Sequence, residues 1–203
     1  MRMEIGLVAC VLLGVFSAAP VGAAEVDPSV YRPMDRRNYP KTFAKWGADG
    51  VKTIDRLRKD AALFAAKSSE CDTVDTSELS EQRSSPPNQI VVFVDCSNGK
   101  RFYLSESDLR TAGHATSQES KMKGLTNEAA MEQCKTRVRS GLAFPSTMSV
   151  KWSGSNVYRA PTTGNVVATF NFDAKNALGN ELPYQARCVF DDRGMHPPEI
   201  SGR

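Results

Sequence analysis

The stretch LPYQARCVF at residues 182–190 carries the clearest secondary-structure signal of the sequence. Its apolar side chains recur at every second position, and successive side chains of a strand point to opposite faces of a sheet. The alternation therefore predicts a half-buried β-strand over residues 182–191. Cys188 falls on the apolar face of this strand together with Tyr184 and Phe190. We expect a helix to cover that face.

The helix expected over this strand begins near Asn127 and ends near Gly141. Asn127 or the preceding threonine suits its N-cap, because both residue types accept hydrogen bonds from the free N–H groups of a first helical turn. The residues expected on its inner face are Ala130, Met131, Cys134 and Val138. With extended segments at 148–152 and 165–173, the pattern predicts a C-terminal module over residues 127–191.

A similar N-terminal module is predicted over residues 42–109. From 42 to 66 large apolar residues recur at steps of three and four, which indicates a helix with one apolar face. The extended runs that follow lie at residues 72–79, 90–96 and 101–104. Asn98-Gly99 predicts a two-residue hairpin turn, and Ser105 suits the cap of a short helix. The predicted fold class is α+β, with two small modules, each one helix packed on a three-stranded antiparallel sheet.

The remaining segments contain few large apolar residues, so we expect them to lie outside the modules. Residues 25–41 suit an extended leader, residues 110–126 a polar linker, and residues 192–203 a flexible tail. Whether the two sheets stay separate or join edge to edge is left open by the sequence.

Four cysteines fall within the predicted modules, and they are Cys71, Cys96, Cys134 and Cys188. Four cysteines allow three connectivities. We expect Cys71 to pair with Cys96 and Cys134 with Cys188, because Cys134 lies on the apolar face of the helix that covers Cys188. Disulfides persist in oxidising compartments outside the cytoplasm.

The first 24 residues have the form of a signal peptide, with Arg2 before an apolar run and small residues after it. Cleavage is expected after Ala24, or one residue earlier. An uncleaved anchor is the alternative, although Glu4 and Pro20 weaken it. LVAC at residues 7–10 matches a lipoprotein signal, but the apolar run continues past the cysteine, which favours an ordinary signal. The predicted location is periplasmic or secreted, with no membrane span after cleavage.

The second half of the chain combines a cysteine-bearing helix, a Pro-Ser step, an Asn-x-x-Gly turn and a cysteine in the last strand. The residues that form this pattern are Cys134, Val138, Pro145-Ser146, Asn176-Ala177-Leu178-Gly179 and Arg187-Cys188-Val189-Phe190. In these features residues 127–191 resemble a domain of uncharacterised exported proteins of Gram-negative bacteria. The resemblance implies a disulfide between the helix and the last strand and a periplasmic or secreted setting, and it implies no particular activity.

The sequence offers little for catalysis or metal binding. Its two histidines, His114 and His196, have no second ligand at helical or turn spacing, and the cysteines form no Cys-x-x-Cys motif. We therefore predict no catalytic residue, no metal and no cofactor.

Two groups of residues are candidates for binding a partner. Lys45, Lys52 and Arg56 lie in a lysine- and arginine-rich helix that suits a protein partner or an anionic envelope surface. Trp152 and Tyr158 are expected to be partly exposed beside the edge of the second sheet. Nucleic acid is a poor candidate, because the net charge is only +3 and basic and aromatic residues are not interleaved.

These observations favour a noncatalytic exported protein with an interaction or accessory role. The alternative is an envelope hydrolase whose active site has no recognisable motif. That alternative requires a concave pocket that gathers His114 with an acid and with a hydroxyl or thiol.

Overall fold

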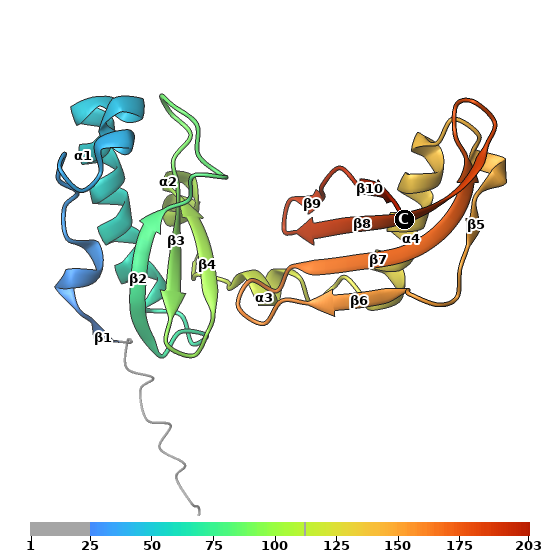
Figure 1. Cartoon of the computed structure of the whole chain (residues 1–203). Helices are drawn as coiled ribbons and strands as arrows, with labels where there is room; N and C mark the ends of the chain where they lie inside the picture. The colour runs from blue at the N-terminus through green and yellow to red at the C-terminus, as the bar shows by residue number, and fades with distance from the viewer. Residues whose placement is uncertain (1–24, 112) are drawn as a thin grey trace, which may run out of the picture.

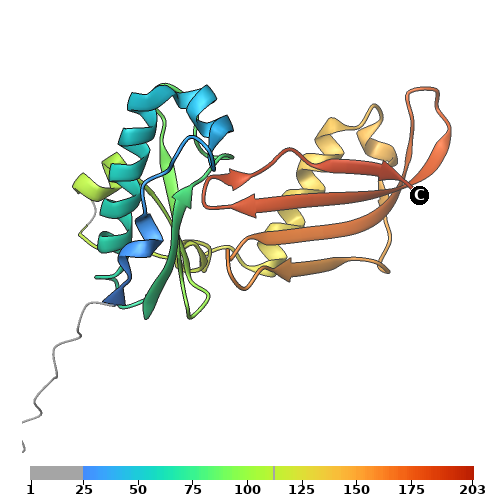
Figure 2. The same cartoon turned by 60° about the vertical axis from the view of Figure 1, so that its left-hand side comes forward.

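A computed structural model of the chain describes residues 25–111 and 113–203, so the predicted signal peptide lies outside the described residues. The fold is mixed α and β, with two separate sheets that lie side by side and are each covered by helix on one face (Figures 1 and 2). We call residues 25–111 the N-lobe and residues 127–203 the C-lobe. No helix of the described part is both long enough and apolar enough to cross a membrane.

The N-lobe contains a sheet of strand order β1-β2-β3-β4, on which the long helix α1 packs (Figure 1). Its elements are β1 (Glu25–Val26), the 3₁₀ helix η1 (Pro28–Tyr31), α1 (Pro40–Ala65), β2 (Thr73–Leu79), β3 (Val91–Cys96), β4 (Arg101–Ser105) and α2 (Glu106–Thr111). The predicted antiparallel strands β2, β3 and β4 are confirmed, and β1 adds to β2 in parallel. The apolar face of α1, from Leu57 to Ala65, packs on Val92, Val94 and Phe102.

Two local features of the N-lobe differ from the prediction. Gly47 interrupts α1 with φ 68°, a left-handed conformation that favours glycine, so the predicted continuous helix is kinked. In the β3–β4 hairpin only Gly99 has positive φ, and its N–H bonds to the carbonyl of Cys96. The hairpin therefore has a three-residue loop with glycine at its last position, in place of the predicted two-residue turn.

The C-lobe is a sheet of strand order β10-β8-β7-β5 covered on one face by α4, with β6 also paired to β7 and β9 to β8. Its elements are α4 (Asn127–Gly141), the 3₁₀ helix η2 (Pro145–Thr147), β5 (Ser149–Val150), β6 (Asn156–Arg159), β7 (Val166–Lys175), β8 (Glu181–Asp191), β9 (Gly194–Met195) and β10 (Glu199–Gly202). Ala186, Cys188 and Phe190 of β8 face α4 and are buried, as the alternation predicts. The sheet has more strands than predicted, because β6, β9 and β10 are too short to show a period.

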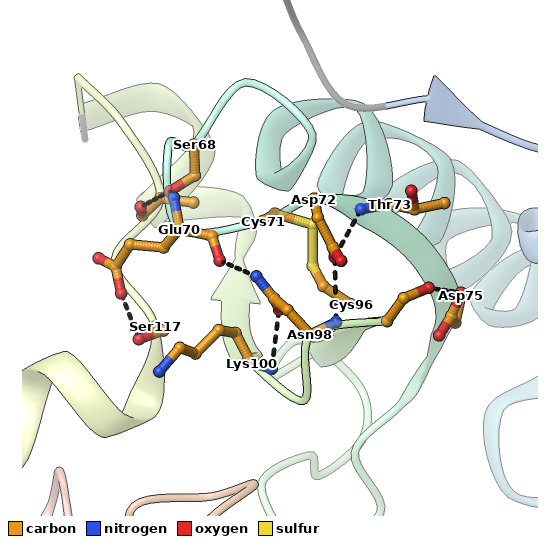
Figure 3. The surroundings of a disulfide bond; sticks show 12 residues. Ser68, Glu70, Cys71, Asp72, Thr73, Asp75, Cys96, Asn98, Lys100 and Ser117 are labelled. Carbon is orange, nitrogen blue, oxygen red and sulfur yellow. Dashed lines mark hydrogen bonds between the residues drawn. A yellow bond between two sulfur atoms is a disulfide. The ribbon is translucent and has the colours of Figure 1, made fainter. Parts of the chain in front are cut away.

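Both predicted disulfides are present. Cys71 bonds to Cys96 and Cys134 to Cys188, with Cα atoms 5.6 and 5.8 Å apart. The second bond joins α4 to β8. Around the first, Asn98 of the hairpin loop donates to the carbonyl of Glu70 and joins the loop to the segment before β2 (Figure 3).

The predicted extended leader is wrong, because residues 25–41 belong to the N-lobe. Met34 is buried, and its N–H bonds to the carboxylate of Asp55 on α1. Arg58 of α1, only 2% exposed, donates to the carbonyl of Arg32. The segment is held by these polar contacts together with scattered apolar residues, such as Val30 and Met34, that pack on the core without a regular period.

The predicted linker and tail also contain regular structure. The helix α3 (Gln118–Lys121) lies between the lobes, and Ser117 and Gln118 are fully buried. Burial raises the pKa of Glu70, but hydrogen bonds donated by Ser117 and Ser120 outweigh burial and bring that pKa below its ordinary value. In the tail, β9 and β10 extend the sheet beside β8. The serine hydroxyls here are paired through hydrogen bonds, whereas the buried Gln118 Oε1 has no partner among the described residues.

Candidate binding cleft

A cleft of about 800 Å³ opens on the N-lobe between α1, α2 and the loop before β3. Its lining comes from Gly50, Thr53, Arg56 and Leu57 of α1, from Pro87, Asn88, Gln89, Ile90 and Val91, and from Ser105, Glu106, Ser107 and Arg110. The volume lies within the range of ordinary ligand sites. The cleft is therefore large enough for a small molecule or for a few residues of a peptide.

Local hydrogen bonds hold two walls of the cleft. At the start of α2 the Ser105 N–H bonds to Asp108 Oδ2 over 2.7 Å, while Ser105 Oγ accepts from the Asp108 N–H over 3.3 Å. This reciprocal cap confirms the predicted cap at Ser105. In the loop, Ser85 and Gln89 exchange backbone hydrogen bonds of 2.8 and 3.0 Å. The loop residues between them are thereby held at one end of the cleft.

The cleft carries an excess of positive charge above an apolar floor. Arg56 and Arg110 each place a guanidinium nitrogen 3.4 Å from the same Glu106 oxygen. One carboxylate thus pairs with two guanidinium groups, and each guanidinium has five N–H donors. All three side chains are more than half exposed, whereas Leu57 beneath them is buried. The arrangement suits a ligand that presents a carboxylate next to an apolar group.

The other predicted basic residues do not line the cleft. Lys45 lies beyond the kink at Gly47 and pairs with Glu81 over 2.9 Å. Lys52 points into solvent, with 79% of its side chain exposed, and pairs with Asp49 over 3.2 Å. Of the three, Arg56 lines this cleft, whereas Lys45 lines a separate cavity together with Tyr39 and Glu81. Glu106 and Arg110 were not predicted as site residues, because the N-terminal module was expected to end at residue 109 and Arg110 fell in the predicted linker. Their i,i+4 spacing was the available signal.

The predicted aromatic residues lie on the C-lobe, away from the cleft. Trp152 is 95% exposed in the turn between β5 and β6, and Tyr158 is 53% exposed on β6. Both lie at the edge of the sheet beside β7, which agrees with their expected placement.

Neither histidine lines the N-lobe cleft. His114 is exposed. His196 lies 3.0 Å from Asp191, but the same carboxylate oxygen also accepts from Arg83 and Arg193. No group of three or more histidine, cysteine, aspartate or glutamate residues in the described ranges is arranged to hold a metal ion.

Compared with known proteins, the chain matches no family model, no curated protein and no solved structure. The resemblance of residues 127–191 to an exported domain therefore stays a prediction.

Proposed function

We propose that the protein is an exported, noncatalytic interaction protein and that the N-lobe cleft binds an acidic segment of a partner polypeptide. The observation that carries the proposal is the pair Arg56 and Arg110, which share one glutamate in a cleft that is also lined by apolar residues. The two disulfides and the signal-like N-terminus support an oxidising compartment.

A peptide suits this lining better than a compact charged metabolite does. The floor is apolar at Leu57, Ile90 and Val91, and Thr53 and Ser107 add hydroxyl groups on either side. An acidic side chain followed by an apolar one would satisfy both parts of the cleft. Arginine binds a carboxylate through two parallel hydrogen bonds, which gives such a site orientation as well as affinity.

Site-specific crosslinking in the host tests the proposal. A photoreactive amino acid at Thr53, inside the cleft, is expected to capture a polypeptide, and the double variant Arg56→Ala/Arg110→Ala is expected to lose at least about nine-tenths of the adduct. Lys52→Ala is the matched control, because Lys52 lies on the same helix outside the cleft.

The double variant is expected to remain folded, since exposed ion pairs contribute about 1 kcal/mol or less to stability. An unchanged adduct in the folded double variant would disprove binding through the arginines. Loss of the adduct in Lys52→Ala as well would show that general positive charge, and not the cleft, attracts the partner.

A further inference from the structure

The strand β10 lies at one edge of the C-lobe sheet. It pairs with β8 on one side, and no strand of the described residues pairs with it on the other. Figure 2 shows it, in dark red, along the upper edge of that sheet. An unpaired strand edge presents backbone N–H and C=O groups to which a further strand can bind.

The hydrogen bonds to β8 show which backbone groups of β10 are free. The Arg203 N–H bonds to the carbonyl of Pro183 over 3.1 Å, in the same register as the β10–β8 pairing. Alternate residues of an antiparallel strand direct their N–H and C=O groups to the same side. Ser201 therefore faces β8, as Arg203 does. Ile200 and Gly202 direct their N–H and C=O groups away from β8, toward the free edge.

We propose that a second copy of the chain pairs with this edge, so that two β10 strands lie antiparallel around a two-fold axis. The register that uses all of the free groups places Ile200 opposite Gly202 of the second copy and Ser201 opposite its own equivalent. Ile200 and Gly202 then exchange both N–H···O bonds on either side of the axis. The two C-lobe sheets become one continuous sheet.

The charges of the two edges are complementary in this register. Glu199 pairs with Arg187 of its own chain over 3.1 Å and lies opposite Arg203 of the second copy. Opposite charges that face each other across a strand pair are stabilising, whereas like charges are destabilising. Charges that protect an edge from self-pairing would place like charges opposite each other, and this edge does the reverse.

The apolar side chains of the two edges also match. Ile200 lies in register with the buried Ala186, so it projects on the face of the sheet that α4 covers, and it is 43% exposed. Gly202 lies in register with Tyr184 on the same face. Because Gly202 has no side chain, Ile200 extends over it toward Tyr184 of the second copy. The pairing thus covers an apolar group that its own chain leaves partly exposed.

Disulfide trapping tests the register directly. Ser201 lies opposite its equivalent in a pair without hydrogen bonds, where Cα atoms are about 4.5 Å apart, within the range of a disulfide. Under mild oxidation, Ser201→Cys in the exported, processed chain is expected to form a covalent dimer. Glu199→Cys is the matched control, because this exposed residue of the same strand lies about 13 Å along the strands from its equivalent. It should give at least about tenfold less dimer, since that distance exceeds disulfide reach.

The variant Ile200→Pro separates pairing between copies from folding of the chain. Proline removes an N–H that points to the second copy and leaves the groups that face β8 in place. Added to Ser201→Cys, it is expected to lower the yield of covalent dimer at least about tenfold, because the edge loses a ladder hydrogen bond on each side of the axis. The circular dichroism spectrum should stay that of the native chain.

Charge reversal gives a second test that needs no cysteine. Because β10 is short, we expect weak, concentration-dependent association in sedimentation experiments. Glu199→Arg and Arg203→Glu should each raise the dissociation constant of the dimer about fivefold, since each places like charges opposite one another. The double variant Glu199→Arg/Arg203→Glu restores opposite charges and should return to within about twofold of the native value. A loss that came only from the Arg187–Glu199 pair within one chain would persist in the double variant.

Three results would overturn the proposal. They are equal dimer yields from Ser201→Cys and Glu199→Cys, a native chain that stays monomeric at about 1 mM, and a double variant that associates as weakly as the single variants. Capture of another protein by Ser201→Cys in the host, without a covalent homodimer, would also overturn it and assign the edge to a different partner. The cleft variant Arg56→Ala/Arg110→Ala should trap the same dimer, because the cleft lies on the N-lobe, so this proposal is independent of the proposed function.

Discussion

Arg83 of the N-lobe donates a hydrogen bond to Asp191 of the C-lobe over 3.2 Å, although the two residues are 108 positions apart. Both side chains are largely buried, with 9% and 4% exposed. The guanidinium also lies 2.8 Å from Asp192 and 3.5 Å from the centre of the Tyr103 ring. The two sheets are thus separate and are joined by a charged cluster at the junction, which answers the question that the sequence left open.

Removing Arg83 should weaken the contact between the lobes. In Arg83→Ala, Asp191 and Asp192 lose a buried cationic partner, and we expect the free energy of unfolding to fall by about 3 kcal/mol. Urea denaturation measures this loss, and small-angle scattering should show a larger radius of gyration. Arg187→Ala is the control, because Arg187 pairs with Glu199 in a solvent-exposed bridge and should cost about 1 kcal/mol or less. Equal losses in the two variants would contradict the assigned role of Arg83.

The same cluster should make stability depend on acid pH. Burial raises the pKa of Asp191, but hydrogen bonds from Arg193 and His196 outweigh burial and hold the pKa below its ordinary value. A lowered carboxyl pKa stabilises the fold above the unfolded-state pKa of about 3.9, and this contribution is lost as the pH falls through the folded value. Urea midpoints of Asp191→Asn should therefore fall less than those of the native chain between about pH 5 and about pH 2. Parallel pH profiles for the two proteins would refute this contribution.

Arg58 should be irreplaceable by lysine. Its guanidinium donates to the carbonyl of Ser77 over 2.7 Å, to that of Arg32 over 3.0 Å and to Glu78 over 2.7 Å. A lysine ammonium cannot reach these separated acceptors together, so Arg58→Lys should cost about 2–4 kcal/mol. Limited proteolysis should then cleave the segment before α1 faster. Lys59→Ala, at the exposed next position, should change neither stability nor cleavage.

The sequence predicted the regular elements that repeat an apolar pattern, and it missed those held by polar contacts. The alternation of apolar residues in β8 and the apolar face of α4 placed Cys188 opposite Cys134. These two patterns together predicted the disulfide between the two residues. In contrast, Ser117 and Gln118 are buried but polar, and the hydropathy of their region is that of a loop. The cleft was missed for a related reason. The residues that line it come from three segments of the chain. These segments lie together only because α2 packs beside α1, and the sequence of one segment alone does not predict that packing.

The disulfides test whether the two lobes fold as one unit. The loop closed by Cys134 and Cys188 spans 54 residues, and that closed by Cys71 and Cys96 spans 25. On the chain-entropy view, replacing either pair by alanine should lower the free energy of unfolding by about 3.5 to 4 kcal/mol.

Hydrogen exchange of the Cys134→Ala/Cys188→Ala variant then shows which elements lose stability. Because the lobes have separate sheets and separate apolar cores, exchange should rise in α4 and β8 while β2, β3 and β4 keep their protection. Equal loss of protection in both sheets would show a single cooperative unit, and the Cys71→Ala/Cys96→Ala variant should then give the same uniform pattern.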